Sequence, residues 1–154
     1  MPRISNINLS YNLEQNMLSI RHERVCREDF LRLIGNGYTN LLACLEEAGS
    51  LATDIPFVAI ENIEPGIFAL EIIVPVPRPL VGKDNIRSWT SRPGKVVWCM
   101  YQGFHRDMTA VYDELETWIT DRRLSRVGPV YEQHYTGLEI SAEKRLTKIA
   151  IPVA

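Results

Sequence analysis

Residues 95–119 read KVVWCMYQGFHRDMTAVYDELETWI, and they carry the clearest structural pattern in the sequence. Its first seven residues, KVVWCMY, are rich in the β-branched and aromatic side chains that favour a strand. From about Arg106 onward, apolar residues recur at the spacing i, i+3, i+4, i+7, which is typical of an amphipathic helix. The apolar positions are Met108, Val111, Tyr112, Leu115, Trp118 and Ile119. The stretch therefore predicts a strand followed by a helix.

Two further β-rich runs follow this helix, at residues 129–135 and 146–153, and the first half of the chain shows the same order. There we predict a strand, a helix, and two strands joined by the turn signal Glu64-Pro65-Gly66. These elements lie at residues 18–25, 27–49, 56–63 and 66–76. Gly35 and Gly37 interrupt the helical pattern, so the first turns of that helix are expected to kink or to separate.

The two halves also end alike, because Val74-Pro75-Val76 and Ile151-Pro152-Val153 lie about 77 residues apart. Such self-similarity indicates an internal duplication. One strand-helix-strand-strand unit buries only one face of its sheet, so two units gain by packing together. We therefore predict a single α+β domain over residues 1–154, with two pseudo-symmetric modules at about 15–78 and 92–154 around a central ligand cleft.

Composition narrows the class of protein. The chain has 154 residues, of which 45% are hydrophobic and 23% charged, and its net charge is -2. This balance argues against direct nucleic-acid binding, which requires a basic face. The one local basic cluster, Arg122, Arg123 and Arg126, is expected to be a solvated helix end. No apolar run reaches 18 residues and the N-terminus has no signal-peptide core, so neither membrane insertion nor secretion is expected.

Cysteine and histidine usage indicates no metal site and no cofactor. Cys26, Cys44 and Cys99 stand far apart without the C-x-x-C spacing of a zinc or redox motif, which suits reduced thiols in the cytoplasm. Cys99 lies in mid-strand, where burial would make its thiol inert. His105 is expected to be a surface or helix-capping residue.

The second half resembles the GyrI-like small-molecule-binding domains, also called the effector-binding domains of AraC-type and other bacterial activators. Four motifs carry the resemblance: the aromatic-x-Gly of Tyr101-Gln102-Gly103, the L-x-x-W of Leu115 to Trp118, the Gly-Pro strand containing Glu132, and the ending Ile151-Pro152. The chain departs from the family at His134, where a tyrosine is usual and Tyr135 stands one position later. This departure puts the role of the usual tyrosine hydroxyl in doubt.

The resemblance implies a cleft that binds hydrophobic, often cationic or aromatic, compounds in a sensor or a sequestering module, with Glu132 facing the cation. Alternation along the strand groups Val130, Glu132 and His134 on one face. If that face met the helix, the buried carboxylate would need partners; otherwise Glu132 would face the cleft or, as in an exposed edge strand, solvent. The expected ligand-binding residues are Glu132, Tyr101, Trp98, Tyr112, His134 and Phe57. Tyr101 is the preferred cleft wall and Trp98 the alternate, while Tyr112 is first a packing residue whose hydroxyl reaches the rim.

Other functions remain open. In a hydrolase of strained, cyclopropane-bearing toxins, Glu132 would position or deprotonate water and Tyr101 or His134 would donate a proton. The chain could instead inhibit gyrase or partner a separate regulator, or it could form a homodimer. No helix-turn-helix is expected, because the first 17 residues are too few for one.

Overall fold

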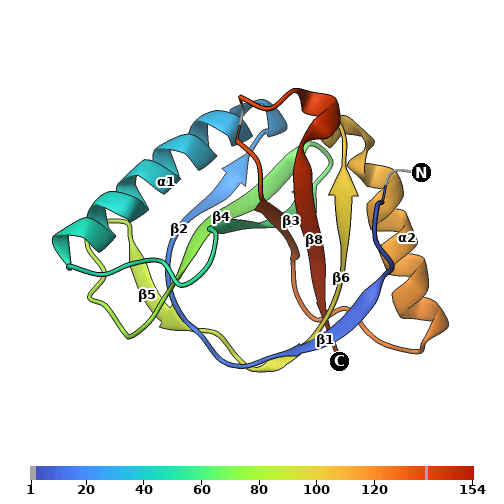
Figure 1. Cartoon of the computed structure of the whole chain (residues 1–154), viewed down its shortest axis with the longest axis horizontal. Helices are drawn as coiled ribbons and strands as arrows, with labels where there is room; N and C mark the ends of the chain where they lie inside the picture. The colour runs from blue at the N-terminus through green and yellow to red at the C-terminus, as the bar shows by residue number, and fades with distance from the viewer. Residues whose placement is uncertain (1–2, 138) are drawn as a thin grey trace. The chain divides into compact units, whose positions relative to one another are not determined.

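A computed structural model describes residues 3–137 and 139–154. The chain divides into two compact units, one made of residues 1–13 and 93–154 and the other of residues 14–92. We call them unit 1 and unit 2. Each consists of antiparallel strands and one long helix (Figure 1), which confirms the predicted α+β class.

Unit 1 contains four strands in the spatial order β1-β6-β8-β7, all antiparallel to their neighbours. Its elements are β1 (Asn8–Asn12), β6 (Gly94–Gln102), the 3-10 turn η2 (His105–Asp107), α2 (Met108–Asp121), β7 (Val130–His134), the 3-10 turn η3 (Ala142–Lys144) and β8 (Leu146–Val153).

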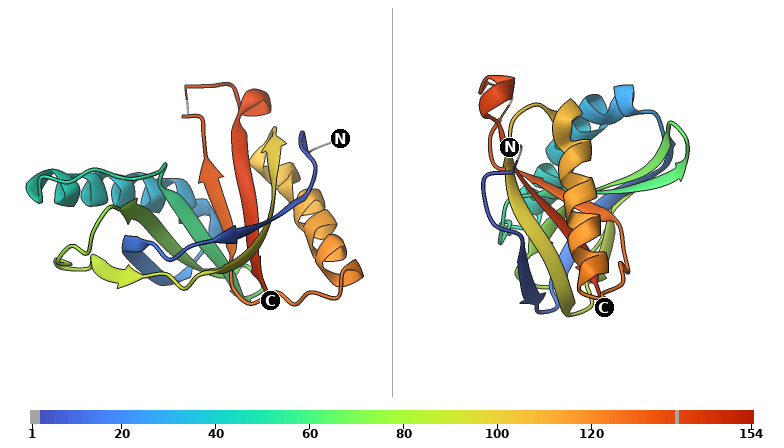
Figure 2. Two further views of the ribbon diagram at one scale, coloured as in Figure 1. Left: turned by 60° about the horizontal axis from the view of Figure 1, so that its bottom comes forward. Right: turned by 90° about the vertical axis from the view of Figure 1, so that its right-hand side faces the viewer.

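Helix α2 covers one face of the unit 1 strands and runs alongside β6 (Figure 2). The predicted stripe is the buried side of α2, since Met108, Val111, Leu115 and Ile119 are all 3% exposed or less. Alternation on β6 places Val97, Cys99 and Tyr101 against the helix. Tyr112 and Trp118 flank this core and are half-buried.

Unit 2 repeats the plan with four antiparallel strands in the order β3-β4-β2-β5. Its elements are β2 (Asn16–Val25), the 3-10 turn η1 (Arg27–Asp29), α1 (Phe30–Glu47), β3 (Phe57–Glu64), β4 (Ile67–Val76) and β5 (Arg87–Thr90). Phe30, Leu41 and Leu45 of α1 pack on the apolar residues of β2, β3 and β4.

Helix α1 is continuous over its 18 residues, so the predicted separation of its first turns at Gly35 and Gly37 is wrong. Gly37 lets the helix pack closely on β4, because a Cβ at this position would lie 3.1 Å from Ile72 Cγ1. Gly49 ends the helix as predicted, with φ +63° and a hydrogen bond from Ser50 N to Leu45 O of 2.9 Å.

Two short strands, β1 and β5, were not expected from the sequence. They occupy the same position in their units, since β1 pairs with β6 and β5 pairs with β2. Neither α1 nor α2 has the apolar length that a membrane-spanning helix requires, and the rest of the described chain contains no other candidate.

Candidate functional site

Glu132 is a buried carboxylate on the helix-facing side of β7. Its relative exposure is 1%, and its neighbour on the same face, Val130, belongs to the core beneath α2. Its cross-strand partner is Ile149 of β8. The exposed edge-strand alternative is therefore excluded. An ionised carboxylate in such surroundings costs on the order of several kcal/mol unless hydrogen-bonding partners compensate it.

Three side chains surround the carboxylate, two of them as hydrogen-bonding partners, and with Glu132 they form what we call the Glu132 cluster. The Tyr112 hydroxyl donates a hydrogen bond to Glu132 Oε2. His105 Nε2 lies 3.1 Å from Glu132 Oε1, and His134 Nε2 lies 3.7 Å from the same oxygen. Both carboxylate oxygens are thus engaged, by one phenol and two imidazoles.

Local structure explains why these side chains meet. His134 follows Glu132 by two residues and shares its strand face. Tyr112 lies in the second turn of α2, at the edge of the apolar stripe, so its ring packs on the core while its hydroxyl reaches Glu132. His105 begins η2, directly before the helix. His105 was expected at the surface or at a helix cap; its side chain is indeed exposed, and it also contacts Glu132, which was not expected.

Tyr101 and Gly103 hold the turn that carries His105. The Tyr101 hydroxyl donates a hydrogen bond of 2.5 Å to Phe104 O. Gly103 has φ +143°, and a Cβ there would lie 2.8 Å from Tyr101 Oη. Gly103 N also donates to Arg145 O at 3.0 Å. The aromatic-x-Gly motif is therefore accounted for by backbone geometry, since only glycine fits this conformation and this contact.

The cluster reaches solvent through its histidines. The side chain of Glu132 is 1% exposed, whereas those of His134 and His105 are 30% and 42% exposed. Burial lowers the pKa of His134; Glu132 opposes this shift and His105 adds to it. The imidazole nearer the core is therefore neutral at neutral pH, and His105 is the most exposed of these three groups.

The other predicted site residues lie elsewhere. Tyr101 is 1% exposed in the core beneath α2, not at an open wall. Trp98 lies on the opposite face of β6, where its Nε1 donates to Ser10 Oγ at 2.9 Å and Lys148 Nζ sits 4.5 Å from its ring centroid. Phe57 begins β3 in unit 2 and is half-buried. Within unit 1 the structure thus assembles Glu132, Tyr112 and His134, and adds His105.

Unit 2 has a second buried carboxylate, Glu71, which the sequence analysis did not single out. Ser19 Oγ donates to Glu71 Oε2 at 2.5 Å, and Arg87 Nη2 lies 3.0 Å from the same oxygen. Arg21 Nη1 lies 3.5 Å from Glu71 Oε1, and Trp89 Nε1 donates to Ser19 Oγ at 2.9 Å. Its position as the single acid in the apolar run GIFALEIIVPV was the sequence feature that could have predicted a buried carboxylate here. Because two arginines already neutralise Glu71, its charge is compensated within unit 2.

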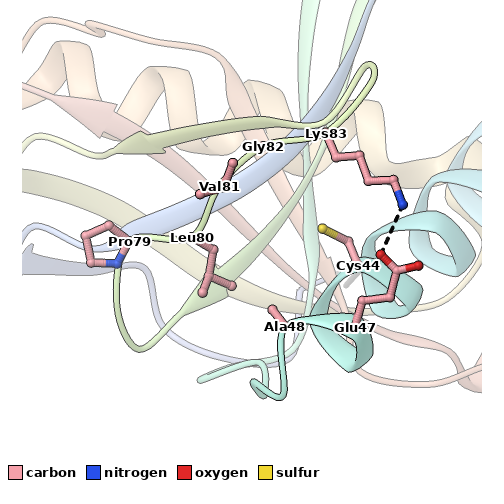
Figure 3. A pocket seen from close by; sticks show the side chains of 8 residues that line it. All are labelled: Cys44, Glu47, Ala48, Pro79, Leu80, Val81, Gly82 and Lys83. Atoms are coloured by element: carbon pink, nitrogen blue, oxygen red, sulfur yellow. Dashed lines mark hydrogen bonds and ion pairs between the residues drawn. The ribbon is translucent and has the colours of Figure 1, made fainter.

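Two cavities have linings that include neither Glu132 nor Glu71. One, of about 570 Å³, is formed by the end of α1 and the loop before β5 (Figure 3), where Lys83 pairs with Glu47 at 3.0 Å beside Cys44. Another, of about 470 Å³, runs along α2 past Trp118 and Glu114. Across residues 3–137 and 139–154, no three His, Cys, Asp or Glu side chains are arranged to hold a metal ion.

Comparison with solved structures shows which proteins share this fold. The C-terminal domain of EcmrR superposes with a TM-score of 0.83 at 17% identity, covering 97% of each chain. In a complex of EcmrR with DNA, the matched region is 57% of the EcmrR chain. A hydrolase from Listeria innocua matches with a TM-score of 0.74 at 13% identity, covering 100% of this chain and 94% of that one.

SAV2435 bound to tetraphenylphosphonium also matches, with a TM-score of 0.58 at 17% identity, over 97% of this chain and 94% of that chain. No family model and no curated protein sequence matches the chain. At these identities the likeness establishes the fold: the chain has the fold of the GyrI-like effector-binding domains, as its motifs predicted.

Proposed function

We propose that this chain, with the fold of the GyrI-like effector-binding domains, binds lipophilic organic cations and uses the Glu132 carboxylate as their counter-charge. The observation that carries the proposal is the kind of partner Glu132 has. Its partners are a phenol and two imidazoles, with no Arg or Lys among them in the described structure. A buried carboxylate without a permanent counter-cation favours a cation brought by a ligand.

Glu71 provides the contrast within the same chain. Two guanidinium groups lie within 3.5 Å of its carboxylate oxygens, so a further cation there would gain little. At Glu132, a ligand cation about 4 Å away would gain on the order of 4 kcal/mol at an effective dielectric near 20, before desolvation is subtracted. The Tyr112 ring could add about 0.5 to 2 kcal/mol through a cation–π contact.

The comparisons support a lipophilic ligand of this charge. SAV2435, which has the same fold, was solved with tetraphenylphosphonium, an organic cation with four aromatic rings. A site built on charge and flat apolar walls demands little hydrogen-bond geometry, so we expect related cations to bind as well. Recognition of several such compounds would suit a sensor or a sequestering module.

Calorimetric titration with tetraphenylphosphonium tests the proposal, with triphenylphosphine oxide as a neutral compound that keeps three of the rings. We expect micromolar affinity for the cation and at least tenfold weaker binding of the neutral compound, since about 1.4 kcal/mol corresponds to tenfold. Equal affinity for the two compounds, or no binding of the cation, would contradict the proposal.

Hydrolysis is a second candidate, favoured by the contact between His105 and Glu132. The carboxylate holds one imidazole nitrogen at 3.1 Å while the side chain stays 42% exposed, an arrangement suited to a general base. His105 would take a proton from water as the oxygen attacks an electrophilic carbon, and the departing group would receive that proton. From the sequence, Glu132 was expected to position or deprotonate water and Tyr101 or His134 to donate a proton, but the Tyr101 hydroxyl already donates its hydrogen bond to Phe104 O.

Mass spectrometry of a strained cyclopropane-bearing electrophile incubated with the protein separates the two candidates. Hydrolysis would yield a product heavier by one water molecule, and the His105→Gln variant would not form it. Recovery of the unchanged compound at high protein concentration would exclude the reaction for that substrate class.

A further inference from the structure

The two histidines of the Glu132 cluster differ in a way that bears on ligand entry. His134 is the more buried of the two, and its Nδ1 lies 3.5 Å from Thr147 Oγ1 of β8. His105 stands on a three-residue 3-10 turn, is the more exposed, and makes the shorter contact with the carboxylate. Of the groups bound to Glu132, His105 is therefore the one whose departure would most directly open the carboxylate to solvent.

We infer that His105 is the internal counter-group that a ligand cation replaces at Glu132, so that cation binding is coupled to proton release and strengthens as pH rises. The inference rests on the proposed cation-binding function. When protonated, the imidazole carries the charge that a ligand would otherwise supply. A ligand cation and the imidazolium therefore compete for the same carboxylate oxygen.

The charged and titratable groups around His105 fit this role. Glu132 and His134 face it from β7, and Tyr112 of α2 binds the other carboxylate oxygen. Arg106 and Asp107 follow it on its own turn, with the Arg106 guanidinium 4.4 Å from the centroid of the Phe104 ring. Glu132 is thus the carboxylate that contacts the imidazole directly.

Histidine is the side chain whose charge ordinarily changes between pH 5 and 8, so the competition falls in an accessible range. A protonated imidazole holds the carboxylate by charge, so the ligand must displace it. A neutral imidazole does not compete for the carboxylate in this way. Linkage of one proton to one site sets a limit of tenfold in affinity per pH unit.

The test is tetraphenylphosphonium binding by calorimetry at pH 5.5, 6.5, 7.5 and 8.5. Three proteins are compared: the natural sequence, His105→Gln and, as a control histidine in unit 2, His22→Gln. We expect the natural protein to gain about three- to tenfold in affinity per pH unit over part of this range. His105→Gln should bind at pH 5.5 more tightly than the natural protein and show a nearly flat profile, while His22→Gln keeps the slope.

The outcomes separate this inference from the proposed function. Binding by the natural protein that does not depend on pH, an unchanged slope in His105→Gln, or binding lost in His105→Gln would overturn the inference and leave cation binding standing. No binding by any of the three proteins at any pH would overturn both.

Discussion

The Tyr112 hydroxyl of α2 and the Glu132 carboxylate of β7 are hydrogen-bonded across the interface between helix and strands in unit 1. This bond connects α2 to a buried carboxylate. Removing the hydroxyl would leave Glu132 Oε2 without its donor, and an unsatisfied buried acceptor costs about 1–3 kcal/mol.

Tyr112→Phe should therefore lower the free energy of unfolding by about 1–3 kcal/mol, measured by urea denaturation. Tyr11→Phe is the matched control, because Tyr11 is 63% exposed on β1 and its change should be close to neutral. Equal, small effects for the two variants would show that the Tyr112 hydroxyl does not support the carboxylate.

A second prediction concerns the contact between two of the sequence motifs, Gly128 and Pro152. A Cβ at Gly128 would lie 2.6 Å from Pro152 Cγ, so Gly128→Ala should force a local shift and destabilise the protein by about 1–3 kcal/mol. Gly35→Ala is the control: nothing lies within 4 Å of its Cβ position on α1, and the helix should gain about 1 kcal/mol. Thermal unfolding should show a lower midpoint temperature for Gly128→Ala and a higher one for Gly35→Ala than for the natural protein.

The thiols should differ sharply in reactivity. Burial raises the pKa of Cys99 to about 11, and its side chain is 0% exposed, whereas Cys26 and Cys44 are partly exposed. Titration with a chromogenic disulfide at pH 8 should label Cys26 and Cys44 in the folded protein, and Cys99 only in urea. Rapid modification of Cys99 without denaturant would contradict the burial of its side chain on β6.

Stability should fall in mild acid because of His134. Burial depresses its pKa in the folded state, so between the ordinary value near 6.5 and the lower folded value the unfolded chain binds more protons. Stability from this residue is therefore present above about pH 6.5 and is lost as pH falls through that window. His134→Gln should show a smaller decrease in unfolding free energy between pH 7 and pH 5 than the natural protein. An equal decrease in both would contradict burial of this imidazole.

The main helices and strands of both units were predictable because the sequence patterns that specify them span only a few neighbouring residues. The apolar stripe of α2 and the glycine that ends α1 each act within a few residues. β1 and β5 could not be found this way. They have five and four residues in polar surroundings, and they are strands because β6 and β2 offer them hydrogen-bonding edges.

The site was predictable only in part. Alternation groups Val130 with Glu132, but it does not say which face meets the helix, so the carboxylate could be assigned to the core or to an opening. The same ambiguity on β6 led to the preference for Tyr101, which the structure buries. His105 was missed as a partner because it contacts Glu132 across 27 residues, and no local pattern signals that contact.

The most direct test of cation binding at Glu132 is the affinity of tetraphenylphosphonium for Glu132→Gln beside Glu143→Gln, measured by calorimetry at pH 7.5. Glu143 is an exposed residue of η3, so its variant removes the same unit of net charge outside the cluster. We predict at least tenfold weaker binding by Glu132→Gln and unchanged binding by Glu143→Gln, with triphenylphosphine oxide bound equally by both. Equal affinity of the two variants for the cation would contradict the account.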